Sequence, residues 1–109
     1  MRNKLYEFIN RTQGVSYVEI EDFFNQAGFE WKGDYNMKHP KYENVYFWSG
    51  WNVEATELLA ELEKDGKVYK EPTEQFIYVM DGRKMNMKVA TRDYDYKTDH
   101  WIPLIWQAK

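Results

Sequence analysis

One segment, 15–28, constrains the fold more than any other, because it carries signals for both ends of a single amphipathic helix. Ser16 and Glu19 have the spacing of a capping box, in which the serine hydroxyl accepts from the Glu19 amide and the Glu19 carboxylate reaches back. Gly28 supplies the left-handed residue that ends many helices. The chain is therefore expected to pack around this helix. Its buried face is predicted to consist of Tyr17, Ile20, Phe23, Phe24 and Ala27.

Apolar residues at helical spacing predict two further helices. The first covers about 2–11. The other covers about 53–64 and follows a turn at Ser49-Gly50, so that either Ser49 or Asn52 is expected to cap it. The apolar face of this last helix is predicted to consist of Trp51, Ala55, Leu58, Leu59 and Leu62.

The rest of the chain has the short apolar runs and turn residues that are typical of strands. Segment 29–41 has the composition of a loop or a loose hairpin. Asp81-Gly82 is a two-residue hairpin signal. Strands are predicted at 45–48, 67–70, 75–80 and 85–89, and alternation in the last would bury Met85, Met87 and Val89. The tail after residue 93 is expected to be irregular and to pack on the body through Trp101, Ile102, Leu104, Ile105 and Trp106.

The residue content argues against an enzyme. Cysteine is absent, which excludes disulfides, thiolate zinc sites and cysteine nucleophiles. Ser16 and Ser49 are explained as helix caps, and the settings of His39 and His100 are those of structural or surface histidines. The glycines are isolated, so no phosphate-binding loop is present. We therefore expect no catalytic residue, no cofactor and no metal.

The chain has 109 residues, which fits a single domain. No apolar run is long enough for a membrane span, and the first residues lead into no signal-peptide core. The expectation is one cytoplasmic domain, acidic overall, without a membrane partner.

The order of the predicted elements over about 2–81 is helix, capped helix, amphipathic helix and short hairpin. This order resembles the winged helix-turn-helix superfamily, and the run at 54–81 looks like its third helix and wing. The resemblance implies an α+β fold with three helices and a small antiparallel sheet. Segment 29–48 would be an insert between the second and third helices, and 83–109 would add a hairpin and a packed tail.

Charge is unevenly distributed along the chain. Residues 1–65 carry 7 basic and 12 acidic side chains, whereas residues 66–109 carry 8 basic and 6 acidic ones. Segment 83–92 contains four basic residues and no acidic one, and aromatic residues follow it, which suits an acidic protein surface or single-stranded nucleic acid. For Trp101, burial in the core is the alternative. The candidate binding residues are Arg83, Lys84, Lys88, Arg92, Tyr94, Tyr96 and Trp101.

The helix expected at 53–64 argues against recognition of duplex DNA by a winged-helix geometry. Its outward positions are predicted to be Glu54, Glu57, Glu61 and Glu63. Neutralisation of phosphates dominates the affinity of proteins for DNA, so a carboxylate face would be repelled. The turn expected at 71–74 is acidic as well. Such a face could instead mimic DNA toward a basic partner.

These observations favour a small non-enzymatic regulatory or adaptor protein that acts by protein–protein recognition. Trp and Tyr, which are enriched at interface hot spots, gather at 42–51 and 94–106. The runs at 44–52 and 100–104 also resemble small accessory proteins of phages and genomic islands of low-GC Gram-positive bacteria. The alternative is a nucleic-acid-binding protein, either a winged-helix transcription regulator or a single-stranded DNA binder, that uses 83–101 rather than the acidic helix.

Overall fold

The computed structural model describes residues 1–92 and 94–109, and over these residues it has four helices and two sheets. The α+β fold class is therefore confirmed. In chain order the elements are α1 (Arg2–Thr12), β1 (Val15–Ser16), α2 (Tyr17–Gln26), β2 (Lys32–Lys38), β3 (Val45–Trp51), α3 (Val53–Lys64), β4 (Val68–Pro72), α4 (Phe76–Met80), β5 (Lys88–Val89), β6 (His100–Trp101) and β7 (Leu104–Ala108).

The three predicted helices form, and their caps follow local sequence. At the start of α2 the Ser16 hydroxyl accepts from the Glu19 amide at 3.1 Å, and the Glu19 carboxylate accepts from the Ser16 amide at 3.1 Å. Of the two candidate caps of α3, Asn52 is the correct one, because its side chain accepts from the Ala55 amide at 2.8 Å. Ser49 lies inside β3 instead.

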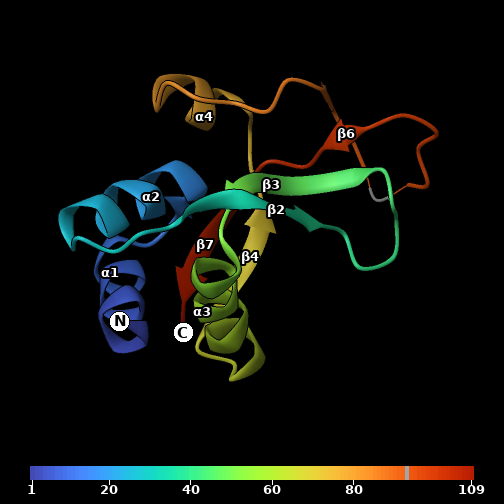
Figure 1. Ribbon diagram of the computed structural model, residues 1–109. Helices are drawn as coiled ribbons and strands as arrows, with labels where there is room; N and C mark the ends of the chain where they lie inside the picture. The colour runs from blue at the N-terminus through green and yellow to red at the C-terminus, as the bar shows by residue number, and fades with distance from the viewer. Residues whose placement is uncertain (93) are drawn as a thin grey trace.

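The first sheet is antiparallel and has the strand order β1-β7-β4. The central strand β7 pairs Trp106 with Val15 on one side and with Lys70 on the other. The prediction of an irregular tail is therefore wrong for the last residues, although the tail does pack on the body. The two termini lie on the same side of the molecule (Figure 1), and the Tyr6 hydroxyl donates to the Lys109 carbonyl at 3.0 Å.

The second sheet has the order β2-β3-β6-β5, and β6 runs parallel to both of its neighbours. The predicted insert is the β2–β3 hairpin, which continues past residue 48 to Trp51. Gly33 permits a bulge in this hairpin, because a Cβ there would lie 2.6 Å from the Cα of Asn52. The predicted strand at 85–89 is reduced to β5. Met85, Met87 and Val89 alternate with exposed residues as predicted, but they are half-buried rather than buried.

The strand predicted at 75–80 is wrong, because this segment is the helix α4. Asp81-Gly82 ends that helix and does not form a hairpin. The antiparallel partner of β4 is β7 and not the segment at 75–80. A short apolar run fits a strand or a helix equally well. Burial of Tyr78 favours the helix, in which its hydroxyl donates to the Leu104 carbonyl at 2.5 Å and accepts from the Tyr17 amide at 3.1 Å.

Aromatic rings make up much of the core. All five tryptophans are buried, and Trp48 lies at the centre, with ring centroids 5.8 Å from Tyr17, 5.1 Å from Tyr78 and 6.1 Å from Trp101. The tryptophan content therefore serves packing rather than an exposed interface. Among the described residues, no helix is both long and apolar enough to cross a membrane.

Candidate functional site

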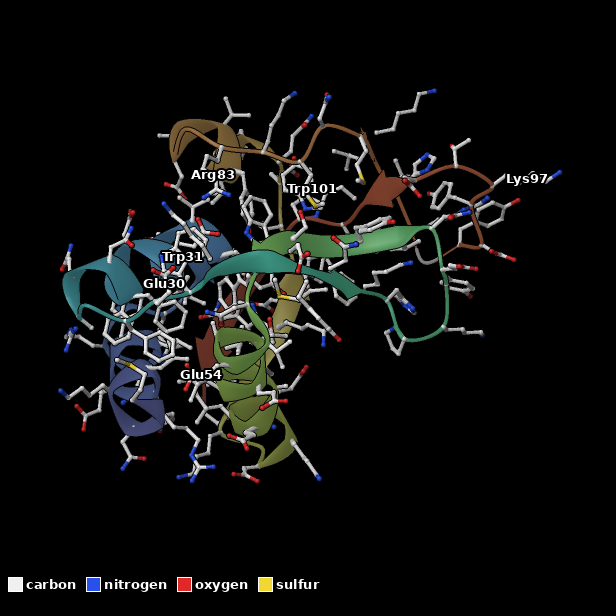
Figure 2. All side chains as sticks on the ribbon, in the orientation of Figure 1. Glu30, Trp31, Glu54, Arg83, Lys97 and Trp101 are labelled. Carbon is white, nitrogen blue, oxygen red and sulfur yellow. The ribbon has the colours of Figure 1, made fainter. Side chains whose placement is uncertain are left out.

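The predicted basic and aromatic residues at 83–101 do not form one surface. Arg83 points back toward the body, where its guanidinium pairs with the carboxylate of Glu21 and lies 5.4 Å from the Trp48 ring and 6.0 Å from the Trp31 ring. Figure 2 shows Arg83 near Trp31 and far from Lys97, which lies in the connection between β5 and β6. Arg83, one of the candidate binding residues, is therefore held against the body by Glu21.

Trp101 is fully buried and therefore offers no surface for stacking. Its Nε1–H donates to the Phe47 carbonyl at 3.1 Å, and its ring packs edge-on against Tyr78 with centroids 5.1 Å apart. Of the two alternatives for this residue, burial in the core is the correct one.

The other three predicted cations, Lys84, Lys88 and Arg92, are exposed as well. The guanidinium of Arg92 lies 4.6 Å from the centre of the Tyr94 ring, and Tyr94 is 48% exposed. The pair of Arg92 and Tyr94 is thus an accessible cation next to an accessible ring.

Tyr96 is tied into its own loop. Its ring stacks on His100 with centroids 3.8 Å apart, and its hydroxyl accepts from the Thr91 amide at 3.2 Å. Hydrogen bonds from Thr91 lower the pKa of the Tyr96 hydroxyl below its ordinary value. Tyr96 therefore shapes the loop, and His100 covers one face of its ring.

A buried carboxylate joins several elements, and the sequence analysis missed it. Glu21 is 2% exposed, and its Oε2 accepts from the Nε1–H of Trp48 at 2.8 Å and of Trp51 at 2.9 Å. Its other oxygen, Oε1, accepts from Arg83. A glutamate on a predicted helix is usually exposed, and no local signal reveals that two indoles from β3 would meet it.

Two buried tyrosines stay protonated near neutral pH. Burial, followed by the neighbouring Tyr78 hydroxyl, raises the pKa of Tyr17 well above its ordinary value, and a contact from Trp106 opposes this rise. Burial likewise raises the pKa of Tyr78 far above the ordinary tyrosine value. Within the described residues, no three acidic or histidine side chains gather to hold a metal ion.

The acidic face of α3 is present. Glu54, Glu57 and Glu61 are exposed, whereas Glu63 is half-buried and pairs with Lys70 at 2.7 Å. Figure 2 shows Glu54 on the opposite side of the β2–β3 hairpin from Arg83. The carboxylates and the basic segment therefore lie on different faces of the protein.

We expect the double substitution Glu54→Lys and Glu57→Lys to change the free energy of unfolding by no more than about 0.5 kcal/mol, because both side chains are solvated. Nonspecific affinity for DNA should rise, since two repulsive charges become attractive. Urea denaturation and fluorescence anisotropy with a duplex oligonucleotide measure the two effects. Loss of an existing DNA complex in the double variant would contradict the orientation assigned to α3.

An exposed apolar face on α4 is the surface feature that the sequence analysis did not predict. Phe76, Val79 and Met80 are 53%, 55% and 79% exposed, and the spacing i, i+3, i+4 puts them on one side of the helix. The opposite side carries the buried Tyr78. In Figure 1, α4 stands at the outer edge of the molecule beyond the β2–β3 hairpin.

No protein-family model, curated protein or solved structure matches this chain. We therefore infer the function from the contacts, burial and charges of the described residues.

Proposed function

We propose that this protein is a small, non-enzymatic regulatory or adaptor protein, and that it recognises a protein partner through the exposed apolar face of α4. The observation that carries the proposal is the alignment of Phe76, Val79 and Met80 on one helix face, each more than half exposed. Contiguous apolar patches on soluble proteins mark interaction sites more often than isolated apolar residues do. Methionine suits such a surface because its side chain adapts to the shape of a partner.

Hydrogen bonds to the body of the protein fix the orientation of α4. The Tyr78 hydroxyl bonds to the backbone of Tyr17 and Leu104, and the Ser16 hydroxyl donates to the Asp81 carboxylate at 2.7 Å. These contacts come from β1 and β7 of the first sheet and from the start of α2, so the helix cannot turn its apolar face inward without breaking them. A surface held in its binding orientation loses little entropy on association, which favours affinity.

The charges around α4 indicate the chemistry of the partner. Lys84 and Lys88 are exposed in the segment that follows the helix, and Arg83 remains half-exposed despite its pair with Glu21. The matching surface is an apolar groove with carboxylates at one end. Such complementarity raises the association rate and sets orientation more than it adds affinity.

The test compares three forms of the full-length chain as bait in extracts of the organism that encodes it. Met80→Asp should abolish capture of a specific partner, because one hot-spot residue is worth about 2 kcal/mol or more of binding free energy. Val53→Asp is the matched control, since Val53 is an apolar residue on α3 that is also more than half exposed. Both variants should melt within a few degrees of the parent, because both sites are exposed. Equal capture by Met80→Asp and the parent would contradict the proposal.

Nucleic-acid binding is the second candidate, and a winged-helix-like body is part of it. The helices α1, α2 and α3 are followed by the antiparallel pair β4 and β7, which is the order expected of that superfamily. In this interpretation the hairpin β2–β3 and the connection 73–103 are two insertions. The exposed pair of Arg92 and Tyr94 supports single-strand binding, whereas the acidic α3 disfavours insertion into a major groove.

Anisotropy titrations with single- and double-stranded oligonucleotides at low salt separate the two candidates. Binding that falls steeply with salt and is lost in Arg92→Ala would support the nucleic-acid candidate. The absence of binding at roughly tens of micromolar protein would remove it.

A further inference from the structure

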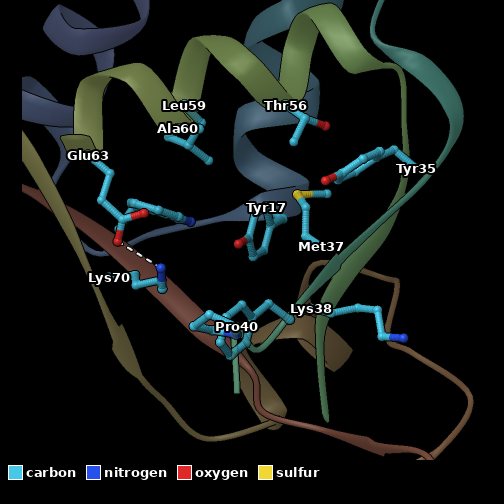
Figure 3. A pocket seen from close by; sticks show the side chains of 12 residues that line it. Tyr17, Tyr35, Met37, Lys38, Pro40, Thr56, Leu59, Ala60, Glu63 and Lys70 are labelled. Atoms are coloured by element: carbon cyan, nitrogen blue, oxygen red, sulfur yellow. Dashed lines mark hydrogen bonds and ion pairs between the residues drawn. The ribbon is translucent and has the colours of Figure 1, made fainter. Parts of the chain in front are cut away.

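A pocket of about 340 Å³ opens between the β2–β3 hairpin, α3 and the first sheet. Four residues of α3 line it, and α3 and α4 lie on opposite sides of the hairpin (Figure 1), so the pocket is separate from the proposed protein-binding face. Its volume falls within the range of small-molecule sites. Apolar side chains form most of its walls (Figure 3), among them Met37, Pro40, Phe47, Leu59 and Ala60.

One buried hydrogen-bond donor lines this pocket without an acceptor among the described residues. Trp106 is 3% exposed, and its Nε1–H makes no hydrogen bond with any described residue. Tyr17 also lines the pocket (Figure 3), and a contact from the Trp106 side chain acts on its hydroxyl. An indole N–H directed at the Tyr17 oxygen would leave the tyrosine O–H to donate in its place. In either arrangement one donor hydrogen of this pair can bond to a ligand, and a buried indole N–H that stays unpaired is costly.

The charges within the pocket already balance. Lys70 pairs with Glu63 at 2.7 Å, and its ammonium lies 5.3 Å from the Phe47 ring and 5.6 Å from the Trp106 ring. Figure 3 shows this pair at one side of the pocket, and it shows Lys38 extending away from it. An anionic ligand would compete with Glu63 for Lys70, whereas a neutral ligand leaves the pair intact.

We propose that this pocket binds a small, neutral, planar molecule with a carbonyl oxygen, whose oxygen accepts the free hydrogen of the Tyr17–Trp106 pair. The rings of Tyr17, Tyr35 and Phe47 supply flat apolar walls for such a molecule. The ligand class is an aromatic carbonyl compound.

Three probes with similar skeletons test the proposal by NMR titration of the full-length protein. Acetophenone has the ring and the carbonyl, ethylbenzene lacks the carbonyl, and benzoate carries a charge. We expect acetophenone at millimolar concentration to shift the Trp106 indole N–H signal saturably, and ethylbenzene to bind about tenfold more weakly, because it offers no acceptor. Benzoate should bind more weakly than acetophenone. Equal binding of ethylbenzene, tighter binding of benzoate, or no binding of acetophenone would overturn the proposal.

Two variants locate the binding. Ala60→Phe places a ring into the pocket from an exposed position on α3, and it should abolish the acetophenone shift. Glu57→Phe adds the same ring to α3 at a residue that does not line the pocket, and it should leave the shift unchanged. Thermal melting checks that both variants fold. Persistence of the shift in folded Ala60→Phe would overturn the assignment to this pocket.

Discussion

We expect Trp101→Ala to destabilise the protein by about 3–5 kcal/mol, the usual range for deleting a large buried aromatic side chain. Trp101 is fully buried, and its ring packs against Trp48 and Tyr78, which hold the second sheet against α2 and α4. Small domains have about 5–15 kcal/mol of stability in total, so the variant should be partly or wholly unfolded at physiological temperature. A circular dichroism melting curve measures the loss.

Trp101→Phe and Tyr94→Ala are the controls for this prediction. The phenylalanine variant keeps part of the packing and should lose an intermediate amount of stability. Tyr94 is close in sequence but half-exposed, and its removal should cost well below half of the Trp101→Ala loss. A Trp101→Ala variant that melts like the parent but loses a binding activity would show that Trp101 is a surface anchor.

Glu21→Ala should cost about 4 kcal/mol, because it removes the acceptor that the described residues supply to two buried indole N–H groups, and each unsatisfied donor costs about 1–3 kcal/mol. The N–H groups of Trp48 and Trp51 both donate to one oxygen of Glu21, which is itself buried. The loss of the ion pair with Arg83 adds less, because the arginine is half-exposed and water can solvate it. Urea denaturation followed by circular dichroism gives the change in free energy.

Glu21→Gln separates acceptor loss from charge loss. The amide oxygen can still accept from both indoles, so this variant should lose about 1–2 kcal/mol, mainly from the bond to Arg83. Equal losses in the alanine and glutamine variants would mean that the charge, and not the acceptor, stabilises this part of the core.

Features of the site that depend on neighbouring residues in the chain could be predicted from the sequence, whereas features that depend on distant residues could not. Lys84, Lys88, Arg92 and Tyr94 are exposed as the local pattern indicated. Arg83, in contrast, is paired with Glu21. This pair could not be predicted, because the two residues are 62 positions apart in the chain and no spacing rule reaches that far.

The α4 face and the pocket were beyond sequence reasoning for related reasons. The run that forms α4 is apolar at every position, so its period cannot distinguish a strand from a helix. The pocket gathers residues from α2, both arms of the β2–β3 hairpin, α3, β4 and β7. None of these side chains is unusual for its own element, and only their meeting makes a cavity.

Local sequence determined α1, α2 and α3 in this protein, because capping, helical spacing and the Asn52 cap act over a few residues. Tertiary structure alone decided that the C-terminal residues become the central strand of the first sheet, between β1 and β4. It also decided that segment 76–80 is helical and that Glu21 is buried. Each of these outcomes depends on partners that are distant in the chain. Buried polar groups need hydrogen-bond partners and buried rings need packing neighbours, and these requirements can override the local preference of a segment.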